Sequence, residues 1–333
     1  MSKFTEAAAV MQTLSLAAME EASRAGIRDA DIDHLFLALT LDAGNAGQVL
    51  RGLGVTLDVA RDAVAAERTD HLASLGVASI DAAGGTGEER IVFHETQGYD
   101  WTDRAVDVLK RASGGQRDGS SSAVLRCLLT EPSGTIGALL SRLGVDTADL
   151  RARLDEADGI RPAHGIRPAA ATERSRGPHG TVSAFVPAPP ADLWMLVSDA
   201  MRIPEWDGAV GQVARGTDTE EDWDAAAPTH APDGKPLRIK DEFRRVRIRR
   251  EQVDAPFRVT WRMSYPDARA ANERVIRFEL EEAAGGTQVR IHFGWERTAG
   301  RRTVLGWLLR PLARLVIFIQ LTQISSGLSR VFR

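Results

Sequence analysis

The sequence predicts two domains of different class, an all-α domain in residues 1–155 and an α+β domain in residues 180–333. The first half repeats one pattern of apolar residues at helical spacing, whereas the second half alternates apolar and polar residues as strands do. A stretch rich in proline, glycine and arginine separates them at residues 156–179. We therefore predict a multidomain protein in which a flexible linker joins the two domains.

The all-α domain contains two copies of one helical unit. The corresponding positions of the first and second copies are Phe4 and Trp101, Thr5 and Thr102, and the Leu-Gly-Val triplets at residues 53–55 and 143–145. Such a repeat is typical of a structural unit that packs against its own duplicate. The second copy is degenerate, because a glycine- and serine-rich segment replaces part of its helical pattern.

In the first copy we expect a helix that Thr5 caps and Gly26 ends. Either Asp31 or Asp33 is expected to cap the next helix, because aspartate accepts hydrogen bonds from the first N–H groups. A last short helix is expected at residues 56–67. The unit is thus all-α with short turns.

The second domain begins with a strand at residues 181–186 and a helix that Pro190 opens. Further strands are expected at residues 208–215, 237–250, 257–265, 274–281 and 287–295. A Gly-Gly pair joins the last two as a hairpin. We interpret residues 218–236 as a polar insertion and residues 301–331 as one long final helix. A strand meander followed by a long helix indicates an α+β domain in which the sheet wraps the helix.

The composition, the net charge and the apolar runs of the sequence favour a cytoplasmic protein without a transmembrane segment. An apolar run at residues 303–321 is about as long as a membrane span but contains Arg310 and Arg314. Each arginine near the centre of a span raises the free energy of insertion into the bilayer by roughly 2.5–3.5 kcal/mol, so we interpret this run as a buried amphipathic helix. One cysteine, Cys127, excludes an internal disulfide, and the N-terminus has no signal-peptide pattern. A net charge of −4 gives no general attraction to nucleic acid.

Residues 1–155 resemble the N-terminal double-repeat domain (Clp R) of Clp unfoldases of the ClpA/ClpC type. The resemblance is carried by the Phe-Thr-Glu start, Glu-Glu-Ala at residues 20–22, Asp-His-Leu at residues 33–35 and the closing triplets. It implies a receptor for adaptors and substrates, which in ClpC-type proteins binds phosphorylated arginine and antibacterial cyclic peptides. The sequence has no GxxxxGK(S/T) phosphate loop, so the ATPase that follows this domain in the family is absent.

The same resemblance places a phosphoarginine pocket at Thr5 and Asp33. The second copy keeps Thr102 but has Ser121 and Ser122 where the acid should be. A guanidinium needs a carboxylate for a bidentate pair, so at most the first pocket is expected to bind. The alternative is that Thr5 and Asp33 only cap helices.

The aromatic residues Phe4 and Trp101 stand at equivalent positions at the starts of the two copies. They either line the groove between the copies, where the family's cyclic peptides bind, or pack inside the domain.

Residues 180–333 resemble the START-like (SRPBCC, polyketide cyclase/dehydrase) superfamily, whose helix-grip fold encloses an apolar cavity. The resemblance is carried by the first strand and helix, Pro-Glu-Trp at residues 204–206, and the meander before the final helix. It implies a hydrophobic small-molecule ligand but no particular chemistry. The candidate cavity residues are Trp194, Trp206, Trp261 and Trp295.

We assign no catalytic residue, metal site or cofactor from the sequence. The carboxylates that qualify by type alone are Glu205, Asp207, Glu242 and Glu279. Glu279 alternates with Phe278 and Leu280, which indicates a position on the solvent face. No two of the seven histidines have the spacing of metal ligands.

The sequence thus favours a non-enzymatic binding protein that captures ligands of the ClpC N-terminal domain as a decoy or regulatory factor. Those ligands are antibacterial cyclic peptides, phosphoarginine-tagged proteins or adaptors, which connects the protein with proteostasis and antibiotic tolerance. The alternative is a START-like lipid carrier, a cyclase-type enzyme or an adaptor that the helical domain recruits to the Clp protease. Competition for a shared ligand separates the two hypotheses.

Overall fold

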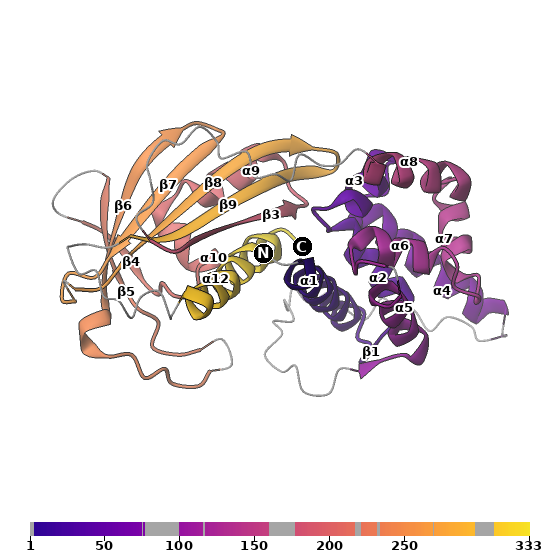
Figure 1. The fold of residues 1–333 in the computed structure, drawn as a ribbon, viewed down its shortest axis with the longest axis horizontal. Coiled ribbons are helices and arrows are strands. Elements are labelled where there is room, and N and C mark those ends of the chain that lie inside the picture. The colour runs from indigo at the N-terminus through magenta and orange to yellow at the C-terminus, as the bar shows by residue number, and fades with distance from the viewer. Residues whose placement is uncertain are drawn as a thin grey trace. The chain divides into compact units, whose positions relative to one another are not determined.

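The computed structural model describes residues 3–74, 76, 100–115, 117–159, 177–216, 221–231, 234–268, 270–296 and 310–333. The chain divides into two compact units, residues 1–165 and 166–333 (Figure 1). The first unit is helical, and the second contains an antiparallel sheet. A helical N-terminal region followed by a sheet domain is the order that the sequence predicts.

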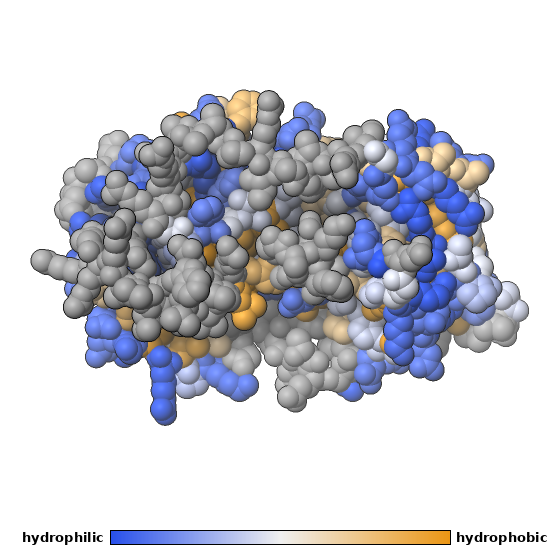
Figure 2. Space-filling model, viewed as in Figure 1, coloured by the Kyte–Doolittle hydropathy of each residue, from blue (hydrophilic) through white to orange (hydrophobic). Residues whose placement is uncertain are grey.

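The described helices of the first unit form two successive sets with the same order. The first set is α1 (Lys3–Arg24), α2 (Ile32–Thr40), α3 (Asn45–Gly52) and α4 (Leu57–Ser74). The second set is α5 (Asp103–Ser113), α6 (Ser121–Leu128), α7 (Thr135–Arg142) and α8 (Thr147–Gly159). Two short strands, β1 (Asp29–Ala30) and β2 (Asp100–Trp101), pair in parallel. On the face seen in Figure 2 the described surface of this unit is mostly hydrophilic, because its apolar side chains point inward.

The Leu-Gly-Val triplets end α3 and α7 with the same backbone geometry. Gly54 and Gly144 have φ values of 83° and 68°, which favour glycine because it lacks a Cβ. The valine after each glycine donates its N–H to the carbonyl five residues earlier, at 3.0 and 2.9 Å. Each triplet is therefore a helix C-cap that satisfies an otherwise unpaired carbonyl.

The starts of the helices differ in part from the prediction. Because α1 begins at Lys3, Thr5 lies within its first turn and not at the capping position. Asp31 is the N-cap of α2, and His34 completes a capping box with it. Asp33 therefore lies in the first turn of α2 and does not cap it.

Two boundaries lie beyond their predicted positions. Helix α4 continues to Ser74, past the expected end at residue 67. Helix α8 continues to Gly159 and so includes the first four residues of the predicted linker. Residues 160–176, the centre of that linker, lie outside the described residues.

The second unit is built on a seven-stranded antiparallel sheet with the order β3-β9-β8-β7-β6-β5-β4. Its strands are β3 (His179–Val186), β4 (Val213–Arg215), β5 (Asp222–Ala226), β6 (Arg245–Asp254), β7 (Arg258–Ser264), β8 (Glu273–Ala283) and β9 (Gly286–Glu296). Its helices are α9 (Pro190–Val197), α10 (Ile203–Trp206) and α12 (Arg310–Val331), with short 3-10 turns at Ala200–Arg202 and Asp241–Phe243. In Figure 1 the sheet is strongly twisted, and α12 packs against β3, β9 and α10.

One face of this sheet and one side of α12 form the core. The buried residues of α12 recur at helical spacing and are Ile317, Leu321, Ile324 and Leu328. Gly327 allows α12 to lie close to the backbone of Trp206 in α10, because a Cβ at this position would lie 2.6 Å from the Trp206 carbonyl oxygen. The predicted final helix began at residue 301, whereas α12 begins at Arg310, and residues 301–309 lie outside the described residues.

Strand β5 corrects the prediction of a polar insertion at residues 218–236. The strand pairs with both β4 and β6, and Trp223 meets the ring of Trp261 edge-on at 5.6 Å. Asp222 is buried there because Arg249 donates to its carboxylate at 2.7 Å. A short strand with one inward tryptophan thus lies inside a segment of polar composition.

The described part of the chain contains no helix that is both long and apolar enough to span a membrane.

Candidate functional site

Asp33, the predicted acid of the first pocket, already has an arginine partner. Arg68 of α4 donates to Asp33 Oδ2 from Nε at 3.1 Å and from Nη2 at 2.6 Å. The backbone N–H of His34 donates to Asp33 Oδ1 at 2.8 Å. The Asp33 side chain is only 13% exposed. An incoming guanidinium would therefore have to replace Arg68.

His34 lies between these charges as a buried, neutral ring. Burial lowers its pKa, and Arg68 lowers it further, although Asp33 opposes the shift. Its Nδ1 accepts the backbone N–H of Asp31 at 3.0 Å, which completes the capping box. The role of His34 is thus structural, at the start of α2.

Thr102, the predicted hydroxyl of the second pocket, meets Asp31 across the β1–β2 pair. Thr102 Oγ1 donates to Asp31 Oδ1 at 2.6 Å, and Arg104 Nε donates to the two carboxylate oxygens at 2.8 and 2.9 Å. Burial raises the pKa of Asp31, but the hydrogen bonds from Arg104 and Thr102 outweigh it and hold the pKa below its ordinary value. From the sequence, Asp31 is expected only as a possible helix cap, and no local pattern indicates its pairing with Thr102 and Arg104. Trp101 lies next to Thr102, partly exposed, and pairs with Ala30.

The second copy has a contact equivalent to the Asp33–Arg68 pair, but its carboxylate comes from the last helix of the copy, α8, and not from α6. Ser122 of α6 donates to Asp158 of α8 at 2.8 Å. Arg126 donates to Asp158 and to Asp155, both at 2.6 Å. The predicted second pocket therefore contains a carboxylate, which α8 supplies and Arg126 neutralises. The structure does not describe the side chains of Phe4 and Thr5, so their predicted roles stay predictions.

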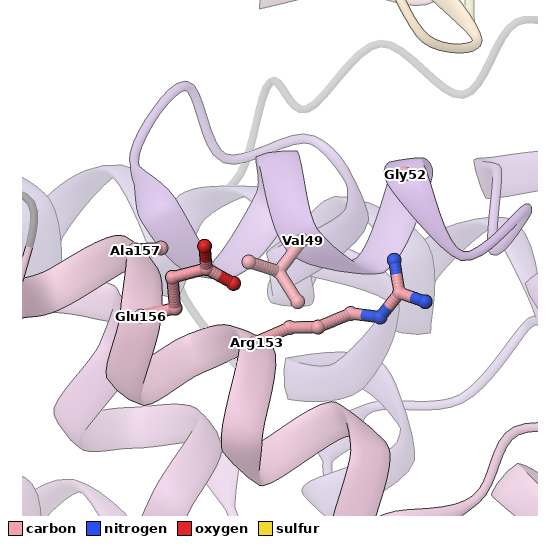
Figure 3. A pocket seen from close by; sticks show the side chains of 5 residues that line it. All are labelled: Val49, Gly52, Arg153, Glu156 and Ala157. Atoms are coloured by element: carbon pink, nitrogen blue, oxygen red, sulfur yellow. The ribbon is translucent and has the colours of Figure 1, made fainter.

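A shallow pocket of about 230 Å³ lies between α3 and α8 in the helical unit. It is lined by Val49, Gly52, Arg153, Glu156 and Ala157 (Figure 3). In the close-up, the side chains of Arg153 and Glu156 lie on either side of Val49. None of the predicted site residues lines this pocket, and its mixed lining does not indicate a particular ligand.

The four tryptophans proposed for the second domain gather at its core. Trp206 and Trp261 are 2% and 0% exposed, while Trp194 and Trp295 are partly buried and pack against the same cluster. Trp261 Nε1 donates to the carbonyl of Val197 at 2.8 Å. The structure thus brings these residues together from α9, α10, β7 and β9.

One buried ion pair interrupts this apolar cluster. Arg274 Nη2 donates to Asp207 Oδ2 at 2.8 Å, and the two side chains are only 7% and 3% exposed. Asp207 Oδ1 accepts the N–H of Ala209 at 3.0 Å. The Arg274 guanidinium also lies 5.6 Å from the ring centroid of Phe293. Asp207 therefore has a hydrogen-bond donor on each carboxylate oxygen.

The other candidate carboxylates do not enter the cluster. Glu205 pairs with Arg202 at the surface, with both contacts at 2.8 Å. Glu242 is exposed. Glu279 lies within 3.6 Å of Arg290 and His292, on the face opposite the buried Phe278 and Leu280, as predicted. The described residues contain no group of three or more possible metal ligands.

Residues 178–317 match the protein family described as polyketide cyclase / dehydrase and lipid transport. This region is a START-like (SRPBCC) domain, and the antiparallel sheet with its long C-terminal helix has the predicted helix-grip fold. The match lies within the second unit and does not extend into the helical unit. No curated protein matches the sequence.

Solved structures similar to this chain also align with just under half of it. A START superfamily protein from Mycobacterium smegmatis is 11% identical, with 47% of this chain and 97% of that chain covered and a TM-score of 0.33. XoxI from Bacillus cereus is 14% identical, with 46% and 95% covered and a TM-score of 0.33. TTHA0849 from Thermus thermophilus is 17% identical, with 46% and 97% covered and a TM-score of 0.34.

Proposed function

We propose that this protein is a non-enzymatic binding protein with two binding domains. The START-like domain holds an apolar ligand against the inner face of its sheet. The helical domain captures ligands of the N-terminal domain of ClpC-type unfoldases and keeps them from the unfoldase. The observation that carries the first part is the buried aromatic cluster between the sheet and α12, in a domain whose family includes lipid transport. The second part rests on the sequence resemblance of residues 1–155.

The inner face of the sheet supports binding more than catalysis. Asp207 is the candidate acid that lies within the buried cluster, and its carboxylate oxygens accept from Arg274 and Ala209. A general base needs a carboxylate that can take a proton from a substrate. An ion-paired carboxylate with hydrogen bonds to both oxygens is poorly suited to that role.

In the helical domain, the contacts of Asp33 favour cyclic peptides over phosphoarginine as the captured ligand. A phosphoarginine guanidinium would compete with Arg68, which the fold holds beside Asp33. A peptide bound through its shape and apolar side chains would not need this carboxylate. Capture works by mass action, so protection of the unfoldase requires comparable affinity and sufficient abundance.

Competition for a labelled ClpC-targeting cyclic peptide tests the decoy proposal. The peptide is first bound to the isolated N-terminal domain of a ClpC-type unfoldase, and the full chain is then titrated while fluorescence anisotropy is followed. We expect displacement, with weaker displacement by Trp101→Ala and no change with Asp107→Asn, which alters an exposed residue of α5. A full chain that leaves the anisotropy constant would reject the decoy. Direct binding of the chain to the unfoldase hexamer would support the adaptor alternative.

A second experiment tests the apolar ligand of the START-like domain. N-phenyl-1-naphthylamine, a neutral apolar dye, fluoresces strongly when it leaves water. We expect a saturable rise in fluorescence with the full chain. A rise that does not saturate would count against a defined apolar site.

A further inference from the structure

We propose that Trp206 and Arg274 form the polar end of the apolar site and select neutral ligands with a hydrogen-bond acceptor, such as a ketone or ester carbonyl. This inference rests on the proposed function, because it requires that the START-like domain bind an apolar ligand. It concerns two N–H groups that the fold buries without a partner.

Trp206 differs from Trp261 in one respect that points to a ligand. Both indoles are buried in the same cluster, and Trp261 Nε1 donates to the carbonyl of Val197 at 2.8 Å. Trp206 Nε1 is equally inaccessible to solvent but has no hydrogen-bond partner. Buried N–H groups in native proteins nearly always have a partner, and an indole can only donate. The group that Trp206 lacks is therefore an acceptor.

Arg274 supplies a second unpaired donor, and its ion pair holds it beside the residue that follows Trp206. Its Nη2 binds Asp207, the residue that follows Trp206, so the ion pair ties Arg274 to the end of α10. Its Nε is buried and has no partner. The Trp206 ring meets Phe278 of β8 edge-on at 5.0 Å, and Arg274 comes from the same strand. Both unpaired donors thus belong to the inner side of the sheet at β8 and α10.

The charges around these donors favour a neutral acceptor. Asp207 balances the charge of Arg274, so the pair as a whole has no net charge. A carboxylate ligand would bring a second negative charge next to Asp207 in a low-dielectric interior, which is unfavourable. The neighbouring side chains include the apolar Ile276, Phe278 and Phe293, together with Tyr265, whose neutral hydroxyl interacts with the Arg274 guanidinium. The ligand class is therefore an apolar molecule with a neutral oxygen acceptor.

Matched dyes test this with the full chain. Prodan is a neutral naphthyl ketone, N-phenyl-1-naphthylamine lacks a carbonyl, and 8-anilinonaphthalene-1-sulfonate is the latter dye with an anionic group. We expect Trp206→Phe to weaken Prodan binding by about fivefold, as for the loss of one ordinary hydrogen bond, and to leave N-phenyl-1-naphthylamine within about twofold. Trp223→Phe is the matched control, because it makes the same replacement in β5 of the same domain, at a tryptophan that is not among the candidate cavity residues, and it should leave the ratio of the two affinities unchanged.

A measurement on the unmodified chain covers the case in which the variant does not fold. The indole N–H resonance of Trp206 should shift on addition of Prodan and not on addition of N-phenyl-1-naphthylamine. An unchanged affinity ratio in Trp206→Phe, or an unshifted resonance, would overturn the inference while apolar binding stands. Such results would arise if the indole N–H faced the ring of Phe278 instead of a ligand. Tighter binding of the anionic dye than of Prodan would overturn the neutral selectivity. Failure of all three dyes would instead remove the proposed function of this domain.

Discussion

Replacing Asp207 by asparagine is expected to destabilise the START-like domain by about 3–5 kcal/mol. The substitution keeps the size of the side chain but leaves the Arg274 guanidinium without its counter-charge. Arg274 is only 7% exposed and lies against the ring of Phe293, so water cannot replace the lost carboxylate. Breaking a buried pair from one side is costly because an uncompensated charge remains in the core.

Urea unfolding followed by tryptophan fluorescence measures this loss. Six of the seven tryptophans lie after residue 178, so the signal reports mainly on the START-like domain. With a slope of about 2 kcal/mol per molar urea, the expected loss lowers the midpoint by about 2 M. A shift that corresponds to less than about 1 kcal/mol would refute the argument that the core excludes water from Arg274.

Two further variants make this result specific. Glu205→Gln breaks the exposed pair with Arg202 in the same domain and should cost less than about 1 kcal/mol. The double variant Asp207→Asn/Arg274→Met removes both charges and should recover much of the stability, because an apolar pair can replace a buried ion pair. A double variant as unstable as Asp207→Asn alone would contradict the argument that the unpaired charge of Arg274 causes the loss, because asparagine retains the Oδ1 that accepts the N–H of Ala209.

Two other predictions concern packing and pH. Gly327→Ala should destabilise the START-like domain by about 1–3 kcal/mol, because the new Cβ would lie 2.6 Å from the Trp206 carbonyl oxygen. Gly137→Ala is the control and should not destabilise α7, because its Cβ would meet no heavy atom within 4 Å; thermal unfolding measures both variants. Burial raises the pKa of Asp31, but hydrogen bonds, led by that of Arg104, lower it below its ordinary value of about 3.9. The ionised Asp31 therefore stabilises the fold above about pH 4, and this stabilisation is lost as the pH falls through the folded-state pKa. Helical circular dichroism during urea unfolding between pH 7 and 2.5 should show a shallower acid loss in Arg104→Gln; a loss as steep as in the unmodified chain would contradict it.

The strands of the meander could be predicted because their apolar residues alternate locally, as Phe278, Glu279 and Leu280 do. Strand β5 could not, because its polar residues hide the pattern. Asp222 is tolerated in the sheet only because Arg249, 27 residues later in the chain, meets its carboxylate. Alternation is a local signal, whereas this compensation depends on a neighbouring strand.

The candidate sites show the same limit of local reasoning. The sequence placed Asp33 at the start of a helix, but it could not show that Arg68, 35 residues later, would neutralise it. Thr102 likewise meets Asp31, 71 residues earlier, because β1 and β2 pair in parallel. Such partners are set by helix packing and strand pairing between distant segments, which no spacing within a single helix reveals.

The pairing of charges in the two copies bears on the ligand that we propose for the helical domain. In the first copy α2 carries the acid and α4 the arginine, whereas in the second copy α8 carries the acid and α6 the arginine. In both copies a helix-to-helix contact thus satisfies the carboxylate from within the fold. A ligand that depends on a guanidinium would have to break such a contact before gaining its own, so its net gain in free energy is small. A cyclic peptide that binds through apolar contacts would not incur this cost, and for that reason we rank it first among the ligands proposed for this domain.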